Sequence, residues 1–137
     1  MNIAINTNNI SKSYPGVLAN SNVSIQINES SIHAIVGENG AGKSTLMKIL
    51  YGMTKPDSGS IEIFNEIVTM SSPKASITLG IGMVHQHFML AKNLTVLENI
   101  ILGIDRPSLK NLGLKKYKKA IEEVMSNYSL DIDLNMY

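Results

Sequence analysis

The sequence has no cysteine, carries little net charge and has no long hydrophobic run, and each absence excludes a class of protein. Without cysteine, the 137 residues cannot form a disulfide framework or a thiolate metal site, which suits a reducing compartment. A formal net charge of +1 at pH 7 gives no electrostatic attraction toward nucleic acid, so no nucleic-acid partner is expected. No apolar run approaches the roughly 20 residues of a membrane span, and any role at a membrane would be peripheral.

The ends and middle of the chain also lack special segments. The N-terminus does not have the basic start and long apolar core of a signal peptide. There is no internal repeat, linker or low-complexity tract, and the length allows one domain at most. We therefore expect a single domain over residues 1–137.

What the sequence does contain is a complete phosphate-binding loop. Residues 37–44 fit the pattern G-x-x-x-x-G-K-[ST], in which glycines let backbone N–H groups turn toward phosphate oxygens. The lysine supplies a positive charge for the β- and γ-phosphates, and the hydroxyl that follows can ligate Mg²⁺. The candidate nucleotide-binding residues of the loop are Gly37, Glu38, Asn39, Gly40, Ala41, Gly42, Lys43, Ser44 and Thr45.

The segments that flank the loop have the order this chemistry needs. Residues 32–36 are predicted to form a buried parallel strand that leads into the loop, and residues 44–51 a helix that Gly52 ends. The N-terminus of that helix would add partial positive charge beneath the phosphates. Its expected core face consists of Leu46, Ile49 and Leu50. The sequence therefore predicts that the chain binds a nucleoside triphosphate.

The remaining pattern predicts an α/β architecture with a β-rich N-terminal part. Strands are expected at residues 3–10, 23–27, 61–63, 67–68 and 81–85, and helices at 72–80, 95–103 and 114–128. Asn65-Glu66 is expected to reverse the chain, Pro73 to stand at a first helical position, and Thr95 with Glu98 to form a capping box. The apolar face of the last helix is expected to consist of Leu114, Tyr117, Ile121, Val124, Met125 and Tyr128.

Three features, in this order and spacing, resemble the nucleotide-binding domain of ATP-binding cassette (ABC) transporters over essentially the whole chain. They are Tyr14, the loop as written in residues 37–46, and Gln86 at the end of an expected strand. Residues 80–90 and 94–100 look like sugar and nucleoside importers, which use a long ATP-binding protein with two cassettes in tandem. The match is to the first cassette. The resemblance implies the P-loop NTPase fold of that family, namely an N-terminal β-subdomain, part of the RecA-like core and the start of the helical subdomain.

The resemblance implies a role for each matching residue, with ATP and Mg²⁺ as cofactors. Lys43 would contact the phosphates, Ser44 the Mg²⁺ and Thr45 the α-phosphate. Gln86 would sense Mg²⁺ and the γ-phosphate and contact the transmembrane subunit, so it counts with Lys43 as catalytic and with Ser44 as metal-binding. From the residues alone, Gln86 would be an ordinary polar strand end.

The base would stack on Tyr14, and Val17 would touch the same base edge. Stacking on an aromatic face is physically reasonable, and the alternative is a turn tyrosine that packs on the sheet. Residues 54–57, Thr-Lys-Pro-Asp, match a guanine-reading pattern. They follow directly behind the loop helix, where a base cannot reach, so we interpret them as a proline turn.

Three family motifs are absent from the sequence. It has no signature motif, no Walker B strand ending in Asp-Glu, and no switch histidine downstream. We therefore expect an incomplete cassette with negligible ATP hydrolysis of its own, whose strand at 32–36 lacks its usual neighbour. The implied partners are the transmembrane permease subunits, a second ATP-binding cassette and, indirectly, a substrate-binding protein, at the cytoplasmic face of the membrane.

Two other functions remain open. The chain could be a truncated, non-catalytic nucleotide-binding fragment or a pseudogene product. It could also belong to another P-loop class, namely a kinase, a GTPase or a soluble ABC protein that acts on DNA or ribosomes. A strong preference for GTP over ATP would favour the GTPase.

Overall fold

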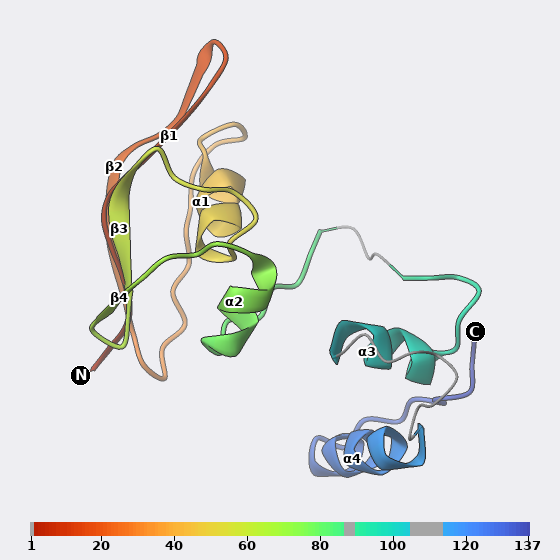
Figure 1. Cartoon of the computed structure of the whole chain (residues 1–137). Helices are drawn as coiled ribbons and strands as arrows, with labels where there is room; N and C mark the ends of the chain where they lie inside the picture. Colours follow the sequence, from red (N-terminus) through yellow and green to blue (C-terminus); the bar gives the residue numbers. More distant parts are fainter. Residues whose placement is uncertain (1, 87–89, 105–113) are drawn as a thin grey trace. The chain divides into compact units, whose positions relative to one another are not determined.

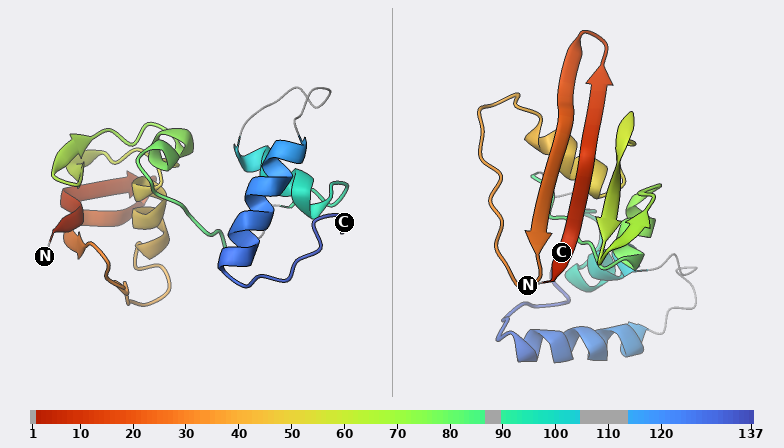
Figure 2. Two further views of the ribbon diagram at one scale, coloured as in Figure 1. Left: turned by 90° about the horizontal axis from the view of Figure 1, so that it is seen from below. Right: turned by 90° about the vertical axis from the view of Figure 1, so that its left-hand side faces the viewer.

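The computed structural model describes residues 2–86, 90–104 and 114–137, without the side chains of 103–104 and 114–116. The chain divides into two compact units, Met1–Val84 and His85–Tyr137, which are described separately. Figure 1 shows the elements along the chain, and Figure 2 gives two further views.

The first unit is built on a four-stranded antiparallel sheet. Its strands are β1 (Ile3–Tyr14), β2 (Val17–Asn28), β3 (Ser58–Ile63) and β4 (Glu66–Val68), in the order β2-β1-β3-β4. The strands expected at residues 3–10, 23–27, 61–63 and 67–68 are confirmed, but β1 and β2 are longer than predicted because they pair along the whole hairpin as far as Tyr14 opposite Val17. The tip of this hairpin projects beyond β3 and β4 (Figures 1 and 2).

The turn between β3 and β4 lies one residue earlier than predicted. Phe64 and Asn65 carry positive φ angles of 49° and 66°, whereas the sequence suggested Asn65-Glu66. Two consecutive left-handed residues are the signature of the tight hairpin turn whose twist matches that of its strands. The requirements of this turn type therefore place the turn at Phe64 and Asn65, and Glu66 is the first residue of β4.

Helix α1 (Lys43–Leu50) covers the sheet with the face that the sequence predicted. Leu46, Ile49 and Leu50 are its buried residues, and Ile49 is completely buried. Figure 1 shows α1 and α2 (Pro73–Thr78) on the same side of the sheet. The core of this unit consists of Ile10, Leu46, Ile49, Leu50, Ile61, Ile63 and Met70.

Helix α2 begins as expected, with Pro73 in its first turn. The Ser72 hydroxyl accepts a hydrogen bond of 3.2 Å from the N–H of Ala75 and so caps the helix. Ser76 on this helix is fully buried and lies 3.5 Å from the sulfur of Met70. The cap and this contact fix α2 against the core.

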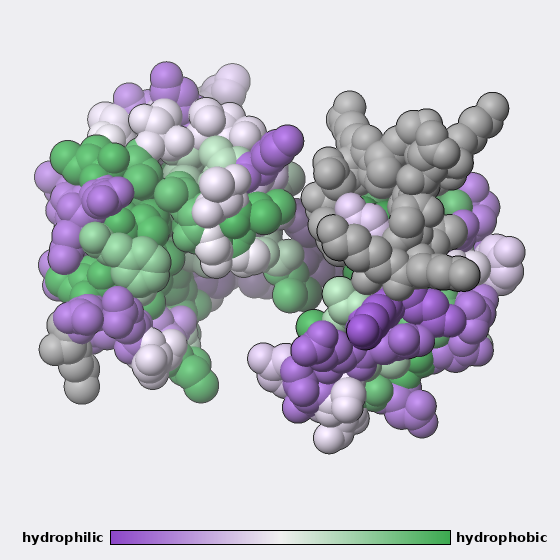
Figure 3. All heavy atoms as spheres, turned by 60° about the horizontal axis from the view of Figure 1, so that its bottom comes forward, coloured by the Kyte–Doolittle hydropathy of each residue, from purple (hydrophilic) through white to green (hydrophobic). Residues whose placement is uncertain are grey.

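Two predicted strands do not form. Residues 32–36 and 81–85 have no strand structure, and Ile32, Val36 and Val84 are almost fully exposed. A strand needs a neighbour to accept and donate its backbone hydrogen bonds, and the described residues supply none to either segment. Hydrophobic side chains therefore reach the surface of the structure (Figure 3). Ile35 and Ile81 nevertheless pack against the core.

The second unit contains α3 (Val96–Ile104) and α4 (Leu114–Asn127). The predicted capping box is confirmed, because the Glu98 carboxylate accepts hydrogen bonds from the Thr95 N–H at 2.8 Å and the Thr95 hydroxyl at 2.9 Å. The chain's last residues complete the start of α3, since the N–H groups of Val96 and Leu97 donate to carbonyls of Met136 and Leu134. A small core forms around Leu97, Ile101 and Leu134.

The predicted face of α4 is confirmed in part. Tyr117, Ile121 and Met125 pack against the small core, whereas Val124 and Tyr128 are exposed. Helical periodicity places these two beside the stripe, but one short partner helix cannot cover so wide a face. The side chain of Leu114 lies outside the described residues.

Candidate functional site

The loop that precedes α1 turns sharply and is held against β2. The N–H of Ala41 donates to the Glu38 carbonyl at 3.2 Å, and Gly40 and Gly42 have φ angles of 87° and 83°. A Cβ atom on Gly42 would overlap the carbonyl oxygen of Ala19 and lie 2.9 Å from Nδ2 of Asn20. Only glycine can therefore occupy position 42, by backbone conformation and by space.

The first turn of α1 provides a favourable environment for an anion. Gly42 is its N-cap, and no side chain caps the N–H groups of the turn. The turn also contains no acidic residue. Its free N–H groups and the helix dipole leave partial positive charge at this end, which favours a bound phosphate.

The Lys43 ammonium lies across the loop. Its Nζ atom donates to the carbonyl oxygens of Gly37 at 2.6 Å and Glu38 at 2.7 Å. These bonds fold the long side chain back toward the loop, so the positive charge and the first turn of α1 share one site. Both features attract the same ligand, a negatively charged group.

A cavity of about 310 Å³ joins the loop to the tip of the β1–β2 hairpin. Tyr14, Val17 and Ala19 contribute the hairpin side. The loop and α1 contribute Asn39, Gly40, Ala41, Gly42, Lys43, Ser44 and Thr45. Of the sequence-predicted residues in this unit, only Gly37 and Glu38 do not line the cavity, and their carbonyls hold Lys43 instead.

Tyr14 stands at the end of β1 and is 42% exposed. The Nζ atom of Lys12 lies over its ring, 5.7 Å from the centroid. A tyrosine that only packed on the sheet would belong to the core, whereas this one lines a cavity together with residues 39–42 of the loop before α1. The geometry thus favours the stacking role, which stays a prediction.

Gln86 belongs to the second unit, where it is exposed and lies in a bend. Residues 87–89, which form part of the motif around it, lie outside the described residues. The role assigned to Gln86 through the resemblance therefore also stays a prediction.

Sequence reasoning missed Asn20, which holds the loop from β2. Only 6% of this residue is exposed, and its Nδ2 atom donates to the Gly42 carbonyl at 3.3 Å. Its Oδ1 atom is buried without a hydrogen-bond partner among the described residues. No local signal in the sequence distinguishes Asn20, because Ser21 and Asn22 beside it are polar as well.

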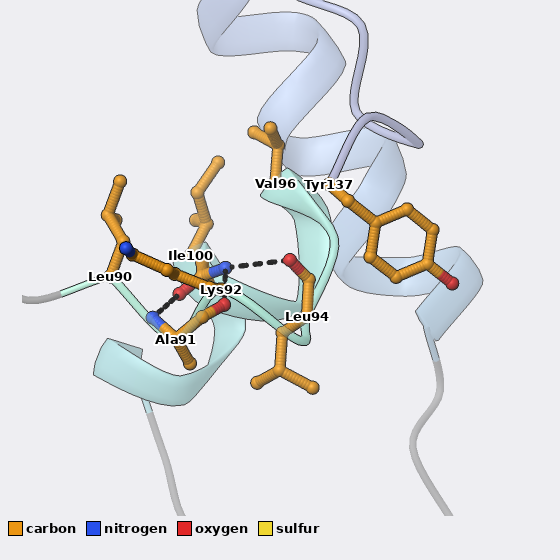
Figure 4. Close-up of a pocket in the computed structure, with 8 residues that line it drawn as sticks. Leu90, Ala91, Lys92, Leu94, Val96, Ile100 and Tyr137 are labelled. Carbon is orange, nitrogen blue, oxygen red and sulfur yellow. Dashed lines mark hydrogen bonds between the residues drawn. The ribbon is translucent and has the colours of Figure 1, made fainter.

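A larger cavity of about 550 Å³ lies in the second unit (Figure 4). Its wall is mostly apolar and contains Leu90, Ala91, Lys92, Leu94, Val96, Asn99, Ile100 and Tyr137. The Asn99 amide is occupied in bonds to the carbonyls of Ala91 and Leu94. With a single cationic side chain and no glycine loop, this cavity is unsuited to a triphosphate.

The chain is similar to known proteins over most of its length. Residues 20–135 match the protein family described as ABC transporter. The guanosine import ATP-binding protein NupO of Bacillus subtilis is 44% identical over 132 residues, which are 96% of this chain and 26% of that protein. The glucose import ATP-binding protein TsgD13 of Haloferax volcanii is 39% identical over 93% of this chain and 28% of its own length.

Solved structures have a similar fold. A nucleotide-free ATP-binding cassette from an ABC transporter superposes with a TM-score of 0.75 at 30% identity, over 93% of this chain and 55% of that one. The ADP conformation of the cassette MJ1267 gives 0.76 at 27% identity, over 95% and 55%. The chain thus has the cassette fold. It spans about a quarter of the length of the curated relatives it matches.

Proposed function

The chain belongs to the ABC transporter family, and on this premise we propose that it is an ATP-binding component of an importer for a simple sugar or a nucleoside. The observation that carries the proposal is the cavity that joins Tyr14 and Val17 to the loop and Lys43. One side fits an aromatic base, and the other fits a chain of phosphates. The printed names of the relatives, among them guanosine and glucose import proteins, support the importer setting.

The phosphates would bind between the loop amides, the first turn of α1 and the Lys43 ammonium. In this arrangement Lys43 exchanges its bonds to the loop carbonyls for bonds to β- and γ-phosphate oxygens, with Gly37 and Glu38 as its neighbours. The hydroxyl of Thr45 would contact the α-phosphate. The adenine would stack on Tyr14, and Val17 would cover its edge.

Mg²⁺ fits this donor set. Ser44 lines the cavity directly after Lys43. Mg²⁺ prefers oxygen ligands, keeps several waters and binds through few protein groups together with substrate phosphates. One hydroxyl beside the phosphate site therefore suffices. The ion would neutralise charge on the phosphates.

Transport would require partners. We propose that residues 1–137 form part of an ABC cassette and act with transmembrane permease subunits, a second cassette and, indirectly, a substrate-binding protein, at the cytoplasmic face of the membrane. No helix in the described ranges is long and apolar enough to cross a membrane. The proposed contact with a permease is assigned to Gln86 through the family resemblance alone.

A Lys43→Ala variant tests the phosphate site. Hydrogen bonds to charged groups contribute about 1.5–3 kcal/mol, so ATP affinity should fall roughly ten- to hundredfold. Lys48→Ala is the matched control, because Lys48 is an exposed lysine at the other end of α1. Calorimetric titration with ATP and GTP measures both variants. Equal affinities for Lys43→Ala and wild type would refute the proposed site, and a strong preference for GTP would refute ATP as the ligand.

A second candidate is nucleotide binding without catalysis by these residues. The sequence has no Walker B Asp-Glu pair, so it supplies no carboxylate of that kind to polarise water. We expect ATP binding without measurable phosphate release by the 137-residue chain. Phosphate release that Lys43→Ala abolishes would contradict this expectation.

A further inference from the structure

Asp57 makes three hydrogen bonds to the end of β1, just before Tyr14. Its Oδ1 atom accepts from Nζ of Lys12 at 2.6 Å, and its Oδ2 atom accepts from the N–H of Ser13 at 2.7 Å. The N–H of Asp57 donates to the Ser11 carbonyl at 2.9 Å. The Lys12 ammonium and then the Ser13 N–H hold the pKa of the Asp57 carboxyl below its ordinary value of 3.8, so it is ionised at neutral pH.

These bonds lie where the sheet narrows to two strands. The ladder between β1 and β3 ends with Ser11 opposite Ser58, and beyond it only β2 pairs with β1. An isolated two-stranded ribbon is marginally stable in water. Beyond the last β1–β3 pair, the Asp57 carboxylate accepts one more hydrogen bond from β1. Its donor is the N–H of Ser13, the residue directly before Tyr14.

Asp57 also holds the Lys12 ammonium in its place over the Tyr14 ring. It pairs with Lys12, whose Nζ atom lies over that ring at 5.7 Å from the centroid. An ammonium over one face of an aromatic ring occupies that face. A base can then stack only on the opposite face, so the ion pair fixes which face of Tyr14 receives it.

We infer that Asp57 is a positioning residue for the nucleotide base, which acts through Lys12 and Ser13 on the orientation of Tyr14. The inference rests on the proposed function, in which adenine stacks on Tyr14. Asp57 is not among the residues that line the cavity. The inference also explains residues 54–57, whose resemblance to a guanine-reading pattern is coincidental, because the aspartate is engaged with β1.

The test compares ATP with inorganic tripolyphosphate, which has the phosphates but no base. Titrations of the 137-residue chain, with Mg²⁺, give the affinity for each ligand. Base–aromatic stacking contributes roughly tenfold or more to affinity, and we expect Asp57→Ala to remove about fivefold for ATP. Tripolyphosphate affinity should stay within about twofold of wild type. Asp57→Asn should lie between, because its amide oxygen can still accept from Ser13.

A double variant separates positioning from general damage. In a Tyr14→Ala background, Asp57→Ala should cause no further loss of ATP affinity, because its effect passes through the ring. Glu66→Gln, which changes an exposed carboxylate on β4, is the control and should leave both affinities unchanged. An equal loss for tripolyphosphate, or a loss that persists without Tyr14, would overturn the inference.

The outcome for Lys43→Ala keeps the two proposals distinguishable. If that variant binds tripolyphosphate as wild type does, the phosphate site and the proposed function fail together. If it loses tripolyphosphate while Asp57→Ala leaves ATP affinity unchanged, the proposed function stands and the inference about Asp57 is wrong.

Discussion

Residues 3–14 and residues 32–36 both contain isoleucine with a further β-branched residue, yet only the first segment is a strand. β1 has β2 on one side and β3 on the other, and Ile10 on it is completely buried. Residues 32–36 have no partner strand in the part of the chain that the structure describes, and Val36 is 91% exposed. The difference lies in pairing, since β-branched residues make up a larger share of residues 32–36 than of residues 3–14.

The two ends of the loop before α1 differ in the same way, because only one of them is held by a neighbouring strand. Its first residues follow an unpaired segment, whereas its last residue, Gly42, is held against β2 by Asn20 and by close packing on Ala19. Lys43 and the first turn of α1 follow directly after Gly42, the end of the loop that is held against β2. The part of the site that would contact phosphates is therefore positioned by β2 and α1, without help from the strand that usually leads into such a loop.

The largest effect is expected from equal truncations in the paired and unpaired segments. Ile10→Ala should lower the free energy of unfolding by about 2–5 kcal/mol, because it opens a cavity in a filled core. Ile32→Ala should change it by less than about 0.5 kcal/mol, because the side chain is already in water. Urea unfolding measures both. A large loss for Ile32→Ala would mean that residues 32–36 are paired in solution.

The second prediction compares two glycines of the loop. Gly42→Ala should abolish ATP binding, because its Cβ would overlap the Ala19 carbonyl and force the loop away from β2. Gly40→Ala meets no atom within 4 Å and bears only the cost of a positive φ, about 1 kcal/mol. Titration with ATP checks the order. Equal losses in the two variants would show that the packing on Ala19 has no importance.

The third prediction concerns Asn20. Asn20→Ala should lower ATP affinity about fivefold, since the lost hydrogen bond to the Gly42 carbonyl contributes about 1 kcal/mol. Ser21→Ala on the same strand is exposed and serves as the control. If both variants bind ATP like wild type, the loop keeps its shape without the Asn20 bond.

The sequence predicted each of the helices that the structure describes, because their signals are local. The capping box at Thr95 and Glu98, the proline at position 73 and the apolar face of α1 each depend on residues a few positions apart. Strand formation depends on a partner far along the chain, which explains the errors at 32–36 and 81–85. The loop residues could be predicted as a motif, whereas Asn20 could not, because its role depends on the packing of β2 against Gly42.

The smallest expected effect is on pH dependence. The Thr95 N–H, and after it the Thr95 hydroxyl, hold the pKa of Glu98 below its ordinary value of 4.5. A carboxyl with a lowered pKa in the folded state stabilises the fold above its unfolded pKa, and this contribution disappears as the pH falls through the folded value. Stability should therefore be constant from neutral pH to about 5 and should decline below the ordinary pKa of glutamate.

Glu98→Gln removes the charge that responds to pH and keeps the shape of the cap. Urea unfolding, followed by circular dichroism between pH 7 and pH 3, should show a shallower decline for this variant than for wild type. Glu66→Gln, on the exposed edge strand β4, should leave the wild-type decline unchanged. Since Glu98 belongs to a local cap and Glu66 to an edge strand, identical curves for the two variants would mean that the Thr95–Glu98 cap makes no contribution to the stability of α3 in solution.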